Sequence, residues 1–441
     1  MTQASAAAAP ALVVYPATNR LEGRDPDLRL EEATGLAEAL GLAVADARVE
    51  PVRDIRPGYF FGQGKVEEIA ARVADLGAEL VVIDAAITPV QQRNLEKAWN
   101  AKVVDRTGVI LEIFALRART AEGRLQVELA RLSYERSRLV RTWTHLERQR
   151  GGRGFLAGPG ESQLEADRRM LDERVARLRR ELEDVRRTRG LHRKTRKKAP
   201  FPLIALVGYT NAGKSTLFNV LTDARVLAKD MPFATLDTTL RGVSLESGIR
   251  AMISDTVGFI SDLPHDLVEA FRATLEEVRE ADLLLHVRDV AHADSPAQKE
   301  DVETILEQLG AGEAAGQHLI EVWNKADRLD DDALMIARSK AMRSESEGGP
   351  PCVLVSALTG DGVDTLFAMI DEAVTEGATL YAVRLAPHEG RARAWLHENG
   401  AVVAESAEDD GAMRLTVRLG ALAAARYERE FGTLGGGDPA V

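Results

Sequence analysis

Over residues 11–118, short runs of β-branched and aliphatic residues alternate with longer stretches in which apolar positions recur every three or four residues. The first pattern is typical of buried strands and the second of amphipathic helices. The expected strands are Ala11–Tyr15, Leu42–Val49, Leu80–Asp84 and Lys102–Asp105. The expected helices follow them at 27–40, 63–76, 88–99 and 107–118. This alternation predicts a small parallel α/β unit.

Two long helical patterns occupy residues 119–199. Apolar residues continue at spacings of three and four, and the second pattern is a cleaner heptad. These positions are Leu125, Leu129, Leu132, Leu139, Trp143 and Leu146, then Leu164, Leu171, Val175, Leu178, Leu182 and Val185. The stretch between them, 150–161, has five Gly and one Pro, so it cannot continue a helix. The sequence therefore predicts an antiparallel helical hairpin with 150–161 at its tip.

Strand-like and helical stretches alternate again from residue 200 to 378. This pattern predicts a doubly wound parallel sheet, whose ligand binds at the carboxyl ends of its strands. Residues 379–441 are expected to form a small α+β domain with a strand, a small helix and further β-like stretches at 391–397, 401–406 and 413–419. The predicted fold class is α/β, with the helical hairpin and the α+β domain as additions.

Length and composition limit the classes of protein to which this chain can belong. A chain of 441 residues, 45% of them hydrophobic and 29% charged, is an ordinary globular protein with several domains. No apolar run reaches the roughly 18 residues that cross a bilayer, so we expect no membrane span. Residues 1–10 have no basic segment and are expected to be a disordered tail rather than a signal peptide. The single Cys352 excludes an internal disulfide, which fits the reducing environment of the cytoplasm. We expect the free protein to be a monomer.

Charge is unevenly distributed. The whole chain has a net charge of −12, yet residues 117–198 contain 24 Lys and Arg against 12 Asp and Glu, a net charge of +12. Such asymmetry predicts a polyanionic partner, and we favour RNA phosphates at the hairpin tip and after its second helix. The candidate RNA contacts are Arg148, Arg150, Arg153, Arg193, Lys194, Arg196, Lys197 and Lys198. A solvated helix face followed by a linker is the alternative.

A phosphate-binding motif opens the third region, after an apolar strand and before a helix. Its residues are Gly208, Tyr209, Thr210, Asn211, Ala212, Gly213, Lys214 and Ser215. Backbone N–H groups and the helix dipole attract phosphate, Lys214 spans the β- and γ-phosphates, and the Ser215 hydroxyl binds Mg²⁺. Asn211 is unusual here: it can ligate a monovalent cation such as K⁺, or simply bond within the loop. The stretch 62–65, GlyGlnGlyLys, lacks this spacing and is interpreted as a turn rather than a second site.

A second motif places a carboxylate at the end of another strand. It comprises Asp255, Thr256, Val257 and Gly258. Asp255 can hold the metal through water, and the Gly258 N–H can contact the γ-phosphate. The next residue is Phe259, where efficient GTPases often have a Gln that orients the attacking water. Unaided hydrolysis is therefore expected to be slow, with the missing polar group supplied by the chain or by a partner.

Two further motifs select the base. They are Asn324, Lys325, Ala326 and Asp327, then Ser356, Ala357 and Leu358. The Asp327 carboxylate can accept from the N1–H and N2 amino groups of guanine, which adenine cannot match. We expect Lys325 to lie along the base, Asn324 to bond the phosphate loop, and the Ala357 N–H to meet guanine O6.

The stretch between the first two motifs is expected to be a nucleotide-dependent switch. Its candidate residues are Phe233, Ala234, Thr235, Leu236 and Asp237. One threonine should bind Mg²⁺ when γ-phosphate is present, and the chemistry alone leaves Thr235, Thr238 and Thr239 as candidates. Lys214, that threonine and Gly258 form the expected catalytic set.

These residues together resemble the HflX-type ribosome-associated GTPases of the translation-factor-like class. The resemblance covers roughly residues 12–375. In the third region it rests on PheAlaThrLeuAsp at 233–237 and AspThrValGlyPheIle at 255–260. Upstream it rests on ArgThrGlyValIleLeuGluIlePhe at 106–114, GlyProGlyGluSerGlnLeuGlu at 158–165 and AspArgArg at 167–169. It implies that Thr235 is the Mg²⁺ ligand. It also implies a hydrolase that binds the 50S subunit and splits or rescues stalled 70S ribosomes after stress. ATP binding by the N-terminal domain is reported for that family, but nothing in this sequence resembles a second phosphate loop.

Three hypotheses follow from the sequence. The first is a GTPase switch that docks on the large ribosomal subunit through its basic hairpin. The second is an rRNA-binding assembly or remodelling factor that uses GTP mainly as a structural clamp. The third, a signalling GTPase with a protein effector, is disfavoured because it gives the basic hairpin no polyanion to meet.

Overall fold

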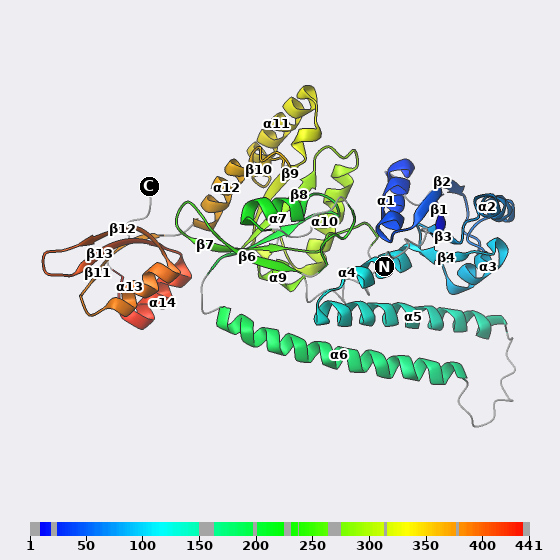
Figure 1. The fold of residues 1–441 in the computed structure, drawn as a ribbon, viewed down its shortest axis with the longest axis horizontal. Helices are drawn as coiled ribbons and strands as arrows, with labels where there is room; N and C mark the ends of the chain where they lie inside the picture. The colour runs from blue at the N-terminus through cyan, green and yellow to red at the C-terminus, as the bar shows by residue number, and fades with distance from the viewer. Residues whose placement is uncertain are drawn as a thin grey trace, which may run out of the picture.

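The computed structural model describes residues 9–18, 24–149, 163–196, 201–224, 231–236, 238–262, 275–312, 315–375 and 379–434. Residues 1–8 of the expected tail, the tip loop 150–161 and Asp237 therefore lie outside the described residues, as do Arg150, Arg153, Lys197 and Lys198. Figure 1 shows an N-terminal unit and a C-terminal unit on opposite sides of a central domain, with two long helices running alongside.

The N-terminal unit is a four-stranded sheet in the order β2-β1-β3-β4, in which all neighbours are parallel. Side chains fix where two of its helices begin: Thr88 and Gln91 form a capping box, and Asp105 accepts from the Gly108 N–H. The predicted parallel α/β unit is confirmed. Its elements are β1 (Pro10–Thr18), α1 (Pro26–Ala39), β2 (Ala43–Val52), α2 (Gln63–Leu76), β3 (Leu80–Ile83), α3 (Pro89–Trp99), β4 (Lys102–Asp105) and α4 (Arg106–Arg117).

Two long helices, α5 (Ala121–Gln149) and α6 (Gln163–Arg196), lie side by side and form an arm (Figure 1). Val175, Leu178 and Leu182 of α6 are buried in one cluster with Leu129 of α5. The heptad stripe therefore forms the seam between the helices, as predicted.

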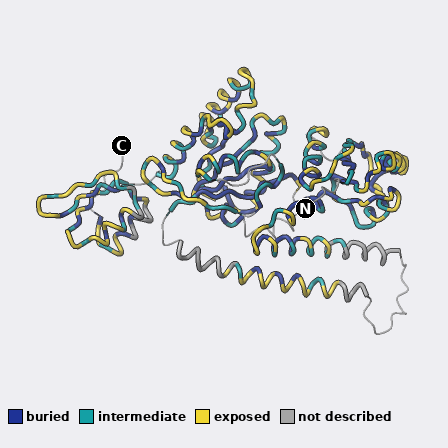
Figure 2. The backbone as a smooth tube through the Cα atoms, viewed as in Figure 1, coloured by how far each residue is buried: buried dark blue, intermediate teal, exposed yellow. Residues whose placement is uncertain are grey.

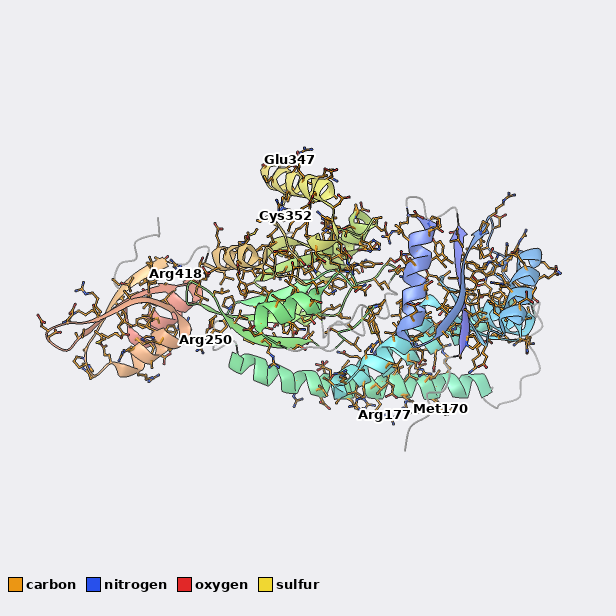
Figure 3. The ribbon with its side chains drawn as sticks, turned by 45° about the horizontal axis from the view of Figure 1, so that its top comes forward. Met170, Arg177, Arg250, Glu347, Cys352 and Arg418 are labelled. Atoms are coloured by element: carbon orange, nitrogen blue, oxygen red, sulfur yellow. The ribbon has the colours of Figure 1, made fainter. Side chains whose placement is uncertain are left out.

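Buried polar contacts join α5 to the N-terminal unit. The Asp105 carboxylate, at the end of β4, accepts from the Tyr134 hydroxyl at 2.6 Å and from Arg138 at 3.0 Å. A satisfied buried carboxylate allows few alternative geometries, so these bonds fix the direction in which α5 leaves the unit. Away from this joint, Met170 of α6 is 58% exposed, and Arg177 on the same helix is also exposed (Figure 3).

The central domain is a six-stranded sheet in the order β10-β9-β8-β5-β7-β6. Five strands are parallel, as predicted for a doubly wound sheet, whereas β6 is an antiparallel edge strand that the sequence did not reveal. Buried apolar clusters cover both faces of the sheet, and its inner strands β5 and β8 are largely buried, as the dark blue centre of Figure 2 shows. The elements are β5 (Leu203–Val207), α7 (Lys214–Thr222), β6 (Thr239–Ser244), β7 (Arg250–Asp255), α9 (Glu276–Glu280), β8 (Leu283–Asp289), α10 (Ser295–Leu309), β9 (His318–Asn324), η2 (Ala326–Arg328), α11 (Asp331–Ser346), β10 (Cys352–Leu354) and α12 (Val363–Thr375).

The C-terminal unit is a three-stranded antiparallel sheet in the order β11-β13-β12, with two helices packed on it. The expectation of a β-like stretch at 391–397 is wrong, because this segment is helical. Ala392 and Leu396 are buried one helical turn apart, while residues 393 and 394 between them are exposed. The elements are β11 (Thr379–Leu385), α13 (Gly390–Asn399), β12 (Ala401–Ala407), β13 (Met413–Leu419) and α14 (Ala421–Phe431). None of the helices described in this chain has the length and apolar character needed to cross a membrane.

Candidate nucleotide-binding site

The loop from Gly208 to Gly213 joins β5 to α7 and requires glycine at both ends. Gly208 has φ +148°, and a Cβ there would lie 2.2 Å from the carbonyl oxygen of Val287 in β8. Gly213 has φ +95°, and a Cβ there would lie 2.1 Å from Asn324 Nδ2. Side chains at either position would clash with the sheet or with Asn324, so the motif is a geometric requirement of this loop.

Lys214 opens α7 and turns back into the loop. Its Nζ donates to the carbonyl oxygens of Gly208, at 3.0 Å, and Tyr209, at 2.6 Å. Burial lowers the pKa of this amine to about 8. The helix N-terminus and the buried amine together form a site suited to a phosphate group.

Three oxygen-bearing side chains meet beside Lys214 and form what we call the oxygen cluster: Ser215, Thr235 and Asp255. Ser215 Oγ lies 2.7 Å from Thr235 Oγ1, and the two hydroxyls donate to Asp255 Oδ2 at 2.7 and 2.9 Å. Asp255 is fully buried, and its Oδ1 has no hydrogen-bond partner among the described residues. Burial raises the pKa of Asp255, and the two hydroxyls and Lys214 oppose that effect. Two half-buried hydroxyls and the buried Asp255, with one carboxylate oxygen unsatisfied, form a set of oxygen ligands that fits Mg²⁺.

Thr235 is thus the candidate threonine that the structure brings to the oxygen cluster, whereas Thr239 begins β6. Phe233, two residues earlier, is buried with φ +53°, an uncommon conformation for a bulky residue. Its ring packs edge-on against Phe114 of α4, with ring centroids 4.6 Å apart. A residue of the N-terminal unit therefore contacts the segment that carries Thr235.

Gly258 lies directly against the phosphate loop. A Cβ on it would come within 3.0 Å of Thr210 Cα and 3.1 Å of Lys214 Nζ, so the close approach depends on glycine. Phe259 is 1% exposed and belongs to the apolar core. Its side chain therefore cannot orient a water molecule, as the sequence predicted.

The base-selecting residues form one bonded group. Asn324 donates to the Ala212 carbonyl at 2.9 Å, which agrees with the expected tie to the phosphate loop. Ser356 Oγ donates to Asp327 Oδ1 at 2.6 Å and so orients the carboxylate expected to bind guanine. The Ala357 N–H, which we expected to face guanine O6, donates instead to Asn324 Oδ1 at 3.0 Å.

Lys325 has a partner that the sequence did not indicate. Its Nζ lies 2.7 Å from Asp289 Oδ2, at the end of β8. No motif points to Asp289, because it comes near Lys325 only through the pairing of β8 with β9.

One cavity brings most of the predicted residues together. Those that line it are Thr210, Asn211, Gly213, Lys214, Ser215, Phe233, Ala234, Thr235, Thr256, Gly258, Asn324, Lys325, Asp327, Ala357 and Leu358. The other described members of the predicted set are not among the lining residues: Gly208, Tyr209, Ala212, Leu236, Asp255, Val257, Ala326 and Ser356. Sequence reasoning missed Thr216, Met231 and Arg328, which also line the cavity. Thr216 and Arg328 directly follow two of the motifs, so their positions could have been inferred.

The four candidate RNA contacts that the structure describes fall into two groups at opposite ends of the arm. Arg148 lies in the last turn of α5, next to the tip, whereas Arg193, Lys194 and Arg196 lie at the far end of α6. A helix of 34 residues is about 50 Å long. The two groups therefore cannot contact the same few phosphates.

Comparison with known proteins places this site in a family. Residues 27–115 match the family described as GTP-binding GTPase N-terminal, and residues 117–196 match GTP-binding GTPase Middle Region. Residues 203–325 match 50S ribosome-binding GTPase, and residues 341–438 match HflX C-terminal domain. GTPase HflX of Magnetococcus marinus is 48% identical over 401 residues, which cover 91% of this chain and 90% of that protein. The chain belongs to the HflX family of GTPases.

Membership of the HflX family confirms the resemblance found in the sequence, together with the α/β fold and the assignment as a GTPase. GTPase HflX of Escherichia coli is 46% identical over 397 residues, covering 90% of this chain and 91% of that protein. Among solved structures, the chain is similar to a GTP-binding protein called SsGBP in complex with GDP, with 23% identity, a TM-score of 0.49 and coverage of 83% of this chain and 99% of that one.

Proposed function

We propose that this HflX-family GTPase is a cytoplasmic switch that binds the 50S ribosomal subunit through its basic arm and splits or rescues stalled 70S ribosomes under stress. The observation that carries the proposal is the combination of a match to a family described as 50S ribosome-binding GTPase with a segment, 117–198, that has a net charge of +12. Such a segment releases many counterions when it meets RNA phosphates.

In the proposed site, the loop 208–213 and Lys214 hold the β- and γ-phosphates of GTP. Ser215 and Thr235 hold Mg²⁺ with Asp255 behind them, because these three side chains already form the oxygen cluster. A Mg²⁺ ion held there would neutralise charge on the phosphates. Asp327, oriented by Ser356, accepts from guanine.

Position 259 supplies no side chain that could orient the attacking water, because Phe259 is packed into the core. The Gly258 N–H and Lys214 remain to stabilise charge on the γ-phosphate. We therefore propose that the free protein hydrolyses GTP slowly and that the 50S subunit accelerates it. Asn211, which is exposed to the cavity, is the proposed ligand for K⁺.

The test is GTP turnover by the purified protein with and without 50S particles, together with co-sedimentation with 50S, 30S and 70S particles in GDP and in a non-hydrolysable GTP analogue. We expect stimulation by 50S and tighter association in the analogue. Absence of stimulation at physiological salt would remove the proposed coupling.

The alternative, an rRNA-binding assembly or remodelling factor with GTP as a clamp, is supported by the length and exposure of the arm alone. Lys214→Ala separates the two proposals. A switch loses nucleotide-dependent ribosome association in this variant, whereas a clamp-type factor binds ribosomes as the parent does.

A further inference from the structure

The segment 259–262, which directly follows Gly258, lies between the phosphate loop and the N-terminal unit. On one side, the Phe259 N–H donates to the Gly208 carbonyl at 3.1 Å, and the Thr210 N–H donates to the Phe259 carbonyl at 2.7 Å. On the other side, Ser261 and Asp262 meet side chains of α1 and α4. The position of Gly258 therefore depends on contacts from two domains.

Tyr209 of the phosphate loop is the side chain that joins the two sides. Its hydroxyl oxygen accepts a hydrogen bond from the Ser261 N–H at 2.9 Å and donates its own proton to Glu32 of α1. Tyr209 is only 5% exposed, and burial raises the pKa of its hydroxyl, so the group is a neutral donor at physiological pH. One hydroxyl thus links the phosphate loop, the segment after Gly258 and the N-terminal unit.

Two buried arginines complete the arrangement. Arg106 Nη1 pairs with Asp84 at 2.6 Å, and its Nη2 lies 3.2 Å from Glu32 and donates to the Ser261 carbonyl at 3.1 Å. Arg29 pairs with Asp262 at 2.5 Å. Burial disfavours the charged form of Glu32, but Arg106 and Arg29 hold its pKa below the usual value.

These residues come from the carboxyl edge of the N-terminal sheet. Glu32 lies on the helix after β1, Asp84 follows β3 and Arg106 follows β4. Ligands of parallel α/β sheets bind at this edge, beside strands whose connections leave in opposite directions. In this chain the edge is occupied by residues 261 and 262 of the GTPase domain.

We propose that Tyr209 is a positioning residue for GTP hydrolysis. Together with Glu32 and Arg106 of the N-terminal unit, it holds the segment 259–262 so that the Gly258 N–H stays directed at the γ-phosphate. This inference rests on the nucleotide site proposed above. With Phe259 unable to orient water, hydrolysis depends more heavily on that backbone donor. The N-terminal unit is therefore part of the hydrolysis machinery as well as the base of the arm.

The test is Tyr209→Phe, which removes only the hydroxyl. Loss of one buried hydrogen bond predicts a fall in kcat of about three- to tenfold. The affinity for a non-hydrolysable GTP analogue should fall by a similar factor, while GDP affinity stays at the parent value because GDP has no γ-phosphate.

The matched control is Tyr134→Phe. Its hydroxyl also bonds a buried carboxylate, Asp105, but the bond lies between the N-terminal unit and α5. Thermal unfolding of both variants measures the loss of stability common to the two changes. Only Tyr209→Phe should alter the preference for the GTP analogue over GDP.

A double-mutant cycle of Tyr209→Phe with Glu32→Gln tests the pair itself. If both act through one bond, the double variant loses no more activity than the more affected single variant. Parent-like kcat and nucleotide preference in Tyr209→Phe, faster turnover, or an equal loss in Tyr134→Phe would each overturn the inference. Failure of the proposed function is distinct, because it appears in the unsubstituted protein as the absence of a response to 50S particles.

Discussion

Ser215 and Thr235 place their hydroxyl oxygens 2.7 Å apart, although one lies in the first turn of a helix and the other in a loop twenty residues later. The two hydroxyls hydrogen-bond to Asp255 as well as lying beside each other, so both would be available as oxygen ligands if Mg²⁺ bound at this point. We predict that Thr235→Ala reduces GTP hydrolysis by about ten- to a hundredfold and raises the Mg²⁺ concentration needed for half-maximal rate. Thr238→Ala is the control, and an equal effect of the two substitutions would show that Thr235 is not the ligand.

The orientation of Asp327 by Ser356 leads to a prediction about the base. Asp327→Asn replaces an acceptor by an amide that donates, so it should weaken GTP binding on the order of 10³-fold. The same amide can donate to the carbonyl that xanthine has in place of the guanine amino group, so xanthosine triphosphate should recover binding. Titration with fluorescent analogues of both nucleotides measures the change. Equal losses for both nucleotides would mean that the substitution damages the pocket rather than its selectivity.

The arm predicts a strong response to salt. Raising NaCl from about 50 to 200 mM should weaken 50S association by roughly 10³- to 10⁵-fold if six to ten phosphates are neutralised. Replacing Arg193, Lys194 and Arg196 by Ala should make the dependence on salt shallower. Arg177→Ala is the control, because Arg177 is an exposed arginine of the same helix that lies 3.8 Å from Glu181. If the parent protein and both variants depend on salt equally, the surface that binds the 50S subunit does not include Arg193, Lys194 and Arg196.

Glu321 of β9 predicts a pH-dependent contribution to stability. It is buried, which opposes ionisation, but Arg288 and Lys299, at 2.6 and 2.5 Å, help to lower its pKa from 4.5 to about 2. Because the pKa of Glu321 is lower in the folded protein than in the unfolded one, its ionised form stabilises the fold above about pH 4.5. This stabilisation disappears as the pH falls toward 2. Glu321→Gln should cost about 3 kcal/mol at neutral pH. Urea unfolding at several pH values measures the difference in the free energy of unfolding between Glu321→Gln and the parent protein. A difference that stays constant down to about pH 3.5 would contradict the lowered pKa of Glu321.

Asn211 predicts a dependence on monovalent cations. It lines the cavity and is exposed to it, with φ +61°. If its amide oxygen binds K⁺ beside the phosphates, hydrolysis should be severalfold faster in KCl than in NaCl, and Asn211→Ala should remove the difference. Equal rates of the parent protein in both salts would leave Asn211 as a loop residue only.

Sequence alone pointed to most of the residues that line the cavity because these residues obey local rules. Gly208 and Gly213 are required by backbone conformation, and Lys214, Asp255 and Asn324 each sit at a strand end or helix start that hydrophobic patterning identifies. The choice of Thr235 was different, since three threonines have the same chemistry. The fold brings Thr235 into hydrogen-bond contact with Ser215 and Asp255, which supports its choice over the other two threonines.

The contacts between domains could not be predicted in this way. Glu32 lies 177 positions before Tyr209, and Arg106 lies 155 positions before Ser261, so no periodicity or motif connects them. Segment 391–397 was misassigned for another reason. Its alternating arginines resemble a strand with one polar face, and the helix becomes evident only when Ala392 and Leu396 are seen to be buried together.

The far end of α6 is connected to the first strand of the nucleotide-binding sheet by only six residues, 197–202. Six residues span at most about 22 Å. The C-terminal end of α6 therefore lies close to the GTPase domain, and its N-terminal end lies farther away. A rotation of about 5° at that point would displace the opposite end of a rod of about 50 Å by roughly 4 Å. The helix pair therefore has the proportions of a lever, in which a small tilt near the GTPase domain becomes a displacement of several ångströms at the opposite end of the helices.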